Sequence, residues 1–130
     1  MSVEHRNTLS KTERLNRKRI IETLFAGGAR TFSVFPLRIV YIPLDSWASP
    51  ATILISVSKK RFKRAVKRNR VKRQIREAYR KNKHDLFCML EEKELKLAIA
   101  FIYLNDKLAP SVEMEQCMKL LLTRLIKKTS

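Results

Sequence analysis

The alternation of apolar and polar residues divides the chain into segments of helical and of strand periodicity. The clearest helical segment lies between residues 65 and 80, where apolar residues recur at i, i+4, i+7 and i+8 and so share one face. That face consists of Val71, Ile75, Ala78 and Tyr79. A polar stripe lies opposite it, because successive helical residues are about 100° apart. The stripe consists of Asn69, Arg73, Arg76 and Arg80. The pattern predicts a helix that packs on one face and presents an amide and three guanidinium groups on the other.

The same patterns predict the remaining elements. Helices are predicted over residues 10–25, 83–92 and 111–128, and strands over 31–42, 52–57 and 95–104. Ser10 and Glu13 form a capping box at the start of the first helix, and Ser111 is predicted to cap the last one. Pro36 indicates an edge position or a strand start, and a further strand near residues 31–33 is an alternative. Helices that alternate with strands indicate an α/β or α+β sandwich, in which helices cover one face of a small sheet.

Composition changes this picture by pointing to a polyanionic partner. The chain has 130 residues, which indicates a single domain over 1–130 with residues 1–8 disordered. Its net charge is +17, and 14 of its 29 basic residues stand between Lys59 and Lys83 beside one acid, Glu77. A solvated charged face usually mixes both signs, whereas arginine forks match the oxygens of phosphate groups. Nucleic acid therefore fits this surface better than a small acidic metabolite does.

A long motif around this helix resembles that of a known family. The chain reads Ser56-Val57-Ser58-Lys59-Lys60, and then Ala65-Val66-x-Arg68-Asn69-Arg70-x-Lys72-Arg73-x-x-Arg76-Glu77-x-Tyr79-Arg80. Over roughly residues 9 to 127 the chain resembles the bacterial ribonuclease P protein subunit. It departs from the family pattern at Arg61-Phe62-Lys63-Arg64, where small or glycine-containing residues are common.

The resemblance implies both a fold and a function. The fold is an α+β sandwich of the ribosomal protein S5 domain 2-like type, with an αβββαβα layout, a mostly antiparallel sheet and a left-handed βαβ crossover around the basic helix. The general rule for such crossovers predicts the opposite hand. In the family, an RNA subunit hydrolyses precursor tRNA with bound Mg²⁺, and the protein binds both the catalytic RNA and the 5′ leader of the substrate. The RNA-binding residues expected within residues 56–80 are Lys59, Lys60, Arg68, Asn69, Arg70, Lys72, Arg73, Arg76 and Arg80.

Aromatic residues suggest a second surface that would hold the leader. In the resembled family, a cleft between the first helix and the sheet holds it, and stacking on aromatic rings above a basic groove binds single strands with little sequence preference. The candidates are Phe25, Phe35, Tyr41 and Arg17. Packing in the core is the alternative interpretation of the three aromatic residues.

The sequence contains no pattern of a protein catalytic or metal site. His5 and His84 are far apart, the two cysteines lack metal-ligand spacing, and no phosphate loop or nucleophile elbow is present. With no signal peptide or membrane span in the pattern, we expect a cytoplasmic protein that has no cofactor of its own. A standalone or ribosome-associated RNA-binding protein remains an alternative. DNA binding is not expected, because no helix-turn-helix pair is evident.

Overall fold

The structure is a computed structural model, and it describes residues 22, 24, 28–44 and 50–129. Glu22 and Leu24 are helical, as the prediction for the first helix requires. The rest of that helix, its capping box and the segment 1–8 lie outside the described residues, as do Arg17 and Phe25.

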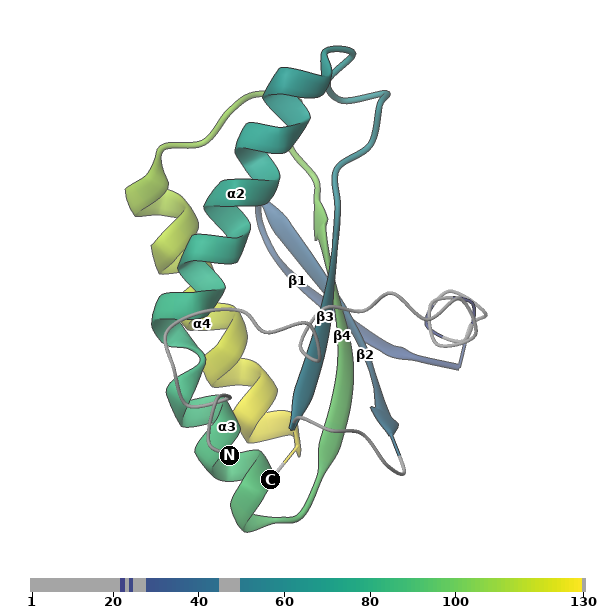
Figure 1. The fold of residues 1–130 in the computed structure, drawn as a ribbon, viewed down its shortest axis with the longest axis vertical. Coiled ribbons are helices and arrows are strands. Elements are labelled where there is room, and N and C mark those ends of the chain that lie inside the picture. Colours follow the sequence, from purple (N-terminus) through teal and green to yellow (C-terminus); the bar gives the residue numbers. More distant parts are fainter. Residues whose placement is uncertain (1–21, 23, 25–27, 45–49, 130) are drawn as a thin grey trace.

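A four-stranded sheet forms one layer of the molecule (Figure 1). Its strands are β1 (Arg30–Val34), β2 (Leu37–Leu44), β3 (Ala51–Ser56) and β4 (Lys96–Tyr103), in the spatial order β1-β2-β4-β3. β1 pairs with β2 and β2 with β4 in antiparallel fashion, whereas β3 and β4 are parallel. The sheet is therefore mostly antiparallel, as expected. The predicted strand 31–42 is two strands, because Phe35 and Pro36 form the turn of a hairpin between β1 and β2. The alternative of a further strand near residues 31–33 is thereby confirmed as β1.

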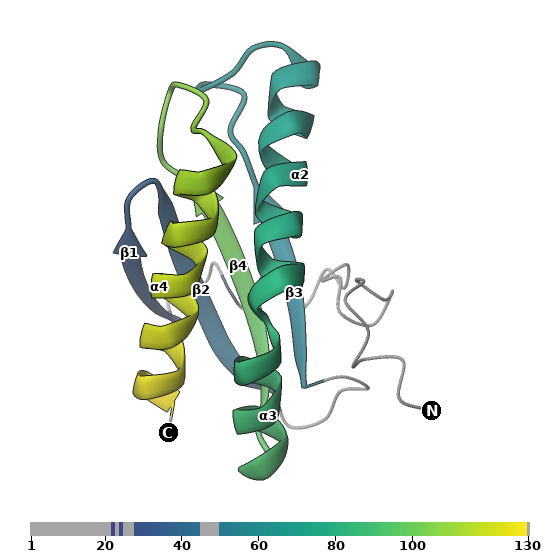
Figure 2. The ribbon, with the colours of Figure 1, turned by 90° about the vertical axis from the view of Figure 1, so that its left-hand side faces the viewer.

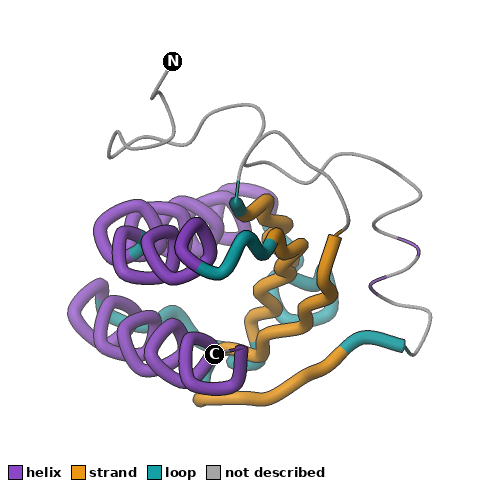
Figure 3. Tube along the Cα trace, turned by 90° about the horizontal axis from the view of Figure 1, so that it is seen from below, coloured by secondary structure: helices purple, strands orange, loops and turns teal. Residues whose placement is uncertain are grey.

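Three helices form the second layer, on a single face of the sheet (Figure 3). They are α2 (Ala65–Asn82), α3 (His84–Glu92) and α4 (Ser111–Thr129). The prediction that Ser111 caps α4 was wrong by one position. The carbonyl of Pro110 accepts the first helical hydrogen bond, from the Met114 amide, so Ser111 is the first helical residue. Its hydroxyl instead accepts a bond from the side-chain amide of Gln74 at 3.2 Å, which links α4 to α2.

The connection from β3 through α2 and α3 to β4 joins two adjacent parallel strands. Viewed from the helix side, both strands run upward and the chain passes in front of the sheet from β3 on the right to β4 on its left (Figure 2). This path is left-handed, against the general rule and in agreement with the family resemblance. The crossover places the basic helix α2 at the β3 edge of the molecule, with its amino terminus beside the loop that follows β4.

Both faces of the two central strands are buried. On the helix side, Leu37, Ile39 and Tyr41 of β2 join the main core, which also contains the apolar faces of α2, α3 and α4. On the other side, Val40 and Ile42 pack with Leu24 and with alanines of β4. The prediction that the strand near residues 95–104 is buried on both faces is thereby confirmed.

The packed face of α2 is the one that the sequence predicts. Val71, Ile75 and Tyr79 are completely buried, and Ala78 is buried as well. The ring of Tyr79 lies 5.7 Å from that of Phe101 in β4, measured between centroids. Complete burial of a large apolar side chain contributes about 1.5–3 kcal/mol, so these contacts fix the helix against the sheet despite its charge. The rotation of α2, and hence the direction of its charged side chains, follows from this packing.

Candidate nucleic-acid interface

The predicted stripe lies on the solvent side of α2. Asn69, Arg73 and Arg76 are exposed, and Arg80 is half-buried. Of the flanking residues, Arg70 is exposed and Lys72 half-buried. No acidic residue stands in the first turn of the helix, and no side chain caps its amino terminus. The result is a rigid, almost purely cationic surface about three turns long, which suits phosphate groups at regular spacing.

Arg80 differs from its neighbours because it is already paired within the helix. Its guanidinium donates two hydrogen bonds to the carboxylate of Glu77, from Nη2 to Oε1 at 2.6 Å and from Nε to Oε2 at 3.2 Å. The bond to Arg80 holds the pKa of the Glu77 carboxyl below its ordinary value. This pairing fixes the orientation of the Arg80 side chain and reduces the local positive charge at the end of the stripe.

Arg68 holds the loop that precedes α2. Its Nη1 donates hydrogen bonds to the carbonyl oxygens of Phe62 and Lys63, at 2.8 and 2.9 Å. These bonds join the first turns of the helix to the loop after β3. The sequence pattern counted Arg68 among the phosphate ligands, and residue type alone carries no signal that separates a loop-holding arginine from an exposed one. The exposed lysines at the start of the motif, Lys59 and Lys60, lie in the turn at the beginning of this loop.

The loop of residues 57–64 is also tied to the loop that follows β4. Nη1 of Arg61 donates a hydrogen bond to the Asp106 carboxylate at 2.9 Å, across 45 residues of sequence. The ring of Phe62 is buried beside that of Tyr103, with 6.0 Å between centroids. The Tyr103 hydroxyl in turn donates to the carbonyl of Lys107 at 2.6 Å. Two loops that are distant in sequence thus form one connected structure.

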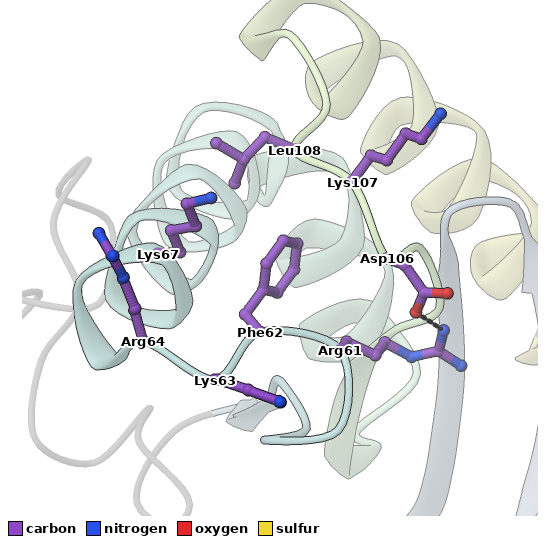
Figure 4. Close-up of a pocket in the computed structure, with 8 residues that line it drawn as sticks. All are labelled: Arg61, Phe62, Lys63, Arg64, Lys67, Asp106, Lys107 and Leu108. Carbon is purple, nitrogen blue, oxygen red and sulfur yellow. Dashed lines mark hydrogen bonds and ion pairs between the residues drawn. The ribbon is translucent and has the colours of Figure 1, made fainter.

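A basic hollow lies between these two loops (Figure 4). It has a volume of about 500 Å³. We call it the two-loop pocket, and its lining consists of Arg61, Phe62, Lys63, Arg64, Lys67, Asp106, Lys107 and Leu108. The sequence gives no sign of this pocket, because its two halves, residues 61–67 and 106–108, are distant along the chain.

The described leader candidates do not come together in one cleft. Tyr41 is only 4% exposed, and its ring packs edge-on against Phe32 on the helix side of the sheet. Leu24 of the first helix lies on the opposite side. Phe35 is 67% exposed, at a hollow that also borders Cys117 and Leu120 of α4. The placement of Tyr41 favours core packing over stacking, and Phe25 and Arg17 lie outside the described residues.

The face of the sheet on which Leu24 packs carries a row of four aligned residues, three of them polar. Strand register aligns Ser33 of β1, Arg38 of β2, Ile102 of β4 and Ser56 of β3. Ser33 and Arg38 are exposed, and the other two are half-buried. The sequence contains a signal for this face. Arg38 stands between the apolar residues Leu37 and Ile39, and successive side chains of a strand point to opposite faces, so Arg38 must point away from the core that those two residues enter.

A cluster of metal-ligating side chains and a membrane-spanning helix are both absent from the described residues. No three histidine, cysteine, aspartate or glutamate side chains there gather closely enough to hold a metal ion. None of the helices in that part is both long and apolar enough to cross a membrane.

Comparisons with known proteins agree on one family. The family model described as Ribonuclease P matches residues 9–126. The chain is 47% identical over 118 residues to the ribonuclease P protein component of Porphyromonas gingivalis, covering 90% of this chain and 85% of the relative. It is 37% identical over 124 residues to that of Chlorobium phaeobacteroides, covering 88% and 84%.

Solved structures of low sequence identity share the fold. The structure of the Staphylococcus aureus RNase P protein at 2.0 Å matches with a TM-score of 0.68 at 19% identity, covering 88% of this chain and 96% of that one. The RNase P protein from Thermotoga maritima matches with a TM-score of 0.66, also at 19% identity, covering 86% and 96%. A family model that spans nearly the whole chain, relatives at up to 47% identity and a shared fold lead to one conclusion: the chain belongs to the ribonuclease P protein component family.

Proposed function

We propose that this chain is the RNA-binding subunit of a cytoplasmic ribonuclease P ribonucleoprotein, in which it binds the catalytic RNA and the 5′ leader of precursor tRNA. In this role it assists the endonucleolytic removal of the leader, which leaves the mature tRNA 5′ end. The observation that carries the proposal is the exposed row of Asn69, Arg73 and Arg76 on α2, directly opposite the buried face. Family membership supplies the identity of the RNA.

The catalytic RNA contacts the α2 surface in this proposal. Guanidinium groups bind phosphate oxygens through two parallel bonds, and a helix that is fixed by its core presents them without further ordering cost. The direct contacts are Lys59, Lys60, Asn69, Arg70, Lys72, Arg73 and Arg76. Arg80 contributes in the orientation that Glu77 sets, and Arg68 contributes through the loop that it holds.

The leader is assigned to the sheet face that carries Arg38. Support comes from the exposed guanidinium of Arg38, the neighbouring hydroxyl of Ser33 and the half-buried side chain of Ile102, which lie in register on that face. An extended strand of RNA matches such a row, with phosphates at the cation and bases over the apolar surface. Phe35, whose ring is exposed in the β1–β2 turn, stays a candidate at the end of the hairpin.

Hydrolysis belongs to the RNA subunit and its Mg²⁺ ions. The described acidic side chains of the basic helix region are engaged with cations, as Glu77 is with Arg80 and Asp106 is with Arg61. A carboxylate held in this way neutralises an arginine and is poorly placed to bind a catalytic metal ion. The protein contributes positioning and charge neutralisation, which are effective means of accelerating phosphoryl chemistry.

Reconstitution tests the function. The purified protein alone is expected to leave precursor tRNA intact, whereas protein with the cognate RNA gives Mg²⁺-dependent cleavage at the tRNA 5′ end. Arg73→Ala/Arg76→Ala should weaken assembly with the catalytic RNA and make its salt dependence shallower by roughly one unit or less per lost contact. Lys93→Ala/Arg124→Ala is the matched control, because it removes two exposed positive charges outside the stripe.

The opposite results would contradict the proposal. Cleavage by protein that is free of RNA would place the chemistry in this chain. Failure to bind the catalytic RNA, together with binding to ribosomal RNA, would support the alternative of a ribosome-associated protein. Equal effects of the stripe and control variants would mean that the stripe is only a solvated surface.

A further inference from the structure

The two-loop pocket is a basic site that is separate from the stripe on α2. We propose that it binds the phosphodiester backbone of RNA at a second point of contact, with Lys63, Arg64, Lys67 and Lys107 as the phosphate ligands. This inference rests on the proposed function, because it assumes an RNA partner, but it assigns contacts to four residues that are absent from the set expected from the sequence motif. The pocket-forming segment Arg61-Phe62-Lys63-Arg64 is where this chain departs from its family pattern.

The charges of the pocket call for an anion. Five cationic side chains and one carboxylate line it, and the carboxylate of Asp106 is taken up by Arg61. Among the described residues, no acidic side chain lies within ion-pair distance of the other four cations. Cations that line one hollow repel each other, and a phosphate bound among them would relieve that repulsion.

The shape of the pocket favours a backbone over a base. Its volume of about 500 Å³ falls within the usual size range of ligand sites and is large enough for a nucleotide. Phe62 lies at its centre (Figure 4), but this ring is only 6% exposed and already packs against Tyr103. A buried ring offers no free face for stacking. The accessible polar groups are the amino and guanidinium ends around the ring, and these bind phosphate.

The pocket is built before any ligand arrives. Arg68 holds the carbonyl groups of Phe62 and Lys63, so the loop that carries Lys63 and Arg64 is fixed to α2. The pair of Arg61 with Asp106 fixes the same loop to the one that carries Lys107. The backbone of the loop therefore needs little further ordering when an anion binds, and only the exposed side chains lose freedom.

A contact at the pocket is independent of a contact at the stripe. Lys67 and Arg76 are nine residues apart on α2 and therefore about 180° apart around its axis. Lys67 points toward the loop after β4 and lines the pocket, whereas Arg76 points to solvent on the other side. One straight RNA segment that lies on the stripe cannot also reach the pocket. The pocket therefore binds a different RNA segment, from either the catalytic RNA or the substrate.

Binding measurements with Lys63→Ala/Lys67→Ala test the proposal. Both side chains are exposed, so this variant should keep the wild-type melting temperature. Its affinity is measured first for the catalytic RNA alone, and then, in the assembled holoenzyme, for precursor and mature tRNA, each at two or more salt concentrations. Arg73→Ala serves as the positive control for the stripe, and Lys93→Ala/Arg124→Ala as the control for loss of charge.

The expected result is a loss of about tenfold per removed contact in one of the two arms, with a salt slope shallower by roughly 0.7–0.9 per phosphate. A loss in the first arm identifies the catalytic RNA as the source of the phosphate, and a loss only in the second identifies the substrate. If Arg73→Ala weakens binding while the pocket variant equals the charge control in both arms, the pocket inference is overturned and the proposed function stands. If wild-type protein binds neither RNA, the proposed function fails first.

Discussion

Arg68→Ala should separate the role of a loop-holding arginine from that of a phosphate ligand. The substitution removes two hydrogen bonds, of 2.8 and 2.9 Å, between the Arg68 guanidinium and the carbonyl oxygens of Phe62 and Lys63. Hydrogen bonds to charged groups contribute about 1.5–3 kcal/mol each when they are well shielded. Arg68 is half-buried and donates both bonds from one nitrogen, so each bond is expected to stabilise the loop by about 1 kcal/mol.

A total of about 2 kcal/mol corresponds to a roughly 30-fold increase in the opening equilibrium of the loop. Hydrogen–deuterium exchange of the Arg61 and Phe62 amides measures this directly, because both donate to the Ser58 carbonyl within the loop. Arg73→Ala removes the same type of side chain from the exposed stripe and should leave these amides protected. Equal protection in wild type, Arg68→Ala and Arg73→Ala would refute the assignment, and Arg68 would then count as an ordinary phosphate ligand.

Three further predictions concern individual side chains. Tyr41→Ala should lower the free energy of unfolding by about 3–5 kcal/mol in urea titrations, because the ring is buried, whereas a selective loss of precursor tRNA binding with unchanged stability would restore the stacking role. Glu77→Gln should reduce stability at neutral pH, and the difference from wild type should vanish in acid. The reason is that the pKa of Glu77 is depressed in the folded state, so its contribution is present above the unfolded pKa and is lost as the pH falls through the folded one. A thiol reagent at pH 8 should modify the exposed Cys88 quickly and Cys117 slowly, since burial raises the pKa of the Cys117 thiol and shields it; equal rates would contradict its burial.

The helical part of the fold was readable from the sequence because helix faces follow from spacing alone. Val71, Ile75 and Tyr79 had to share a side of α2, and whatever lay opposite them had to face solvent. The long motif then gave the family, and with it the layout of the sheet and the hand of the crossover. Spacing alone could give neither, because the order β1-β2-β4-β3 depends on pairings between distant segments.

The faces of the central strands were harder to predict, for a physical reason. In a strand that is exposed on one side, polar residues mark the outer face, but both faces of β2 are apolar over residues 39–42. Within these four residues Tyr41 and Val40 look equivalent, and only the phase set by Arg38 indicates that Val40 shares a side with Leu24 while Tyr41 joins the main core. Residue type makes Tyr41 a leader candidate, but residue type does not determine the face of the sheet on which a side chain lies.

The same limit applies to the arginines of the motif. Arg68, Arg73 and Arg80 carry the same group, yet one holds a loop, one is exposed and one is paired with Glu77. Arg68 differs because of the path of the chain before the helix, and Arg80 differs because Glu77 stands three residues before it. The sequence shows the position of Glu77 but not the path of the loop.

The position of β3 at the edge of the sheet bears on the fate of the newly made chain. Within the described strands it pairs only with β4, so its other edge has no strand partner there, and its last three residues, Leu54 to Ser56, are only half-buried. Backbone groups at such an edge can pair with a strand from another molecule. Its sequence, Thr52-Ile53-Leu54-Ile55, is uncharged and rich in β-branched residues, which is typical of aggregation-prone segments. Lys59, Lys60 and Arg61 follow within a few residues and act as gatekeepers, because stacking copies of this strand would bring their charges together. Before any RNA is present, repulsion between these cations thus opposes the pairing of β3 strands from different copies of the protein.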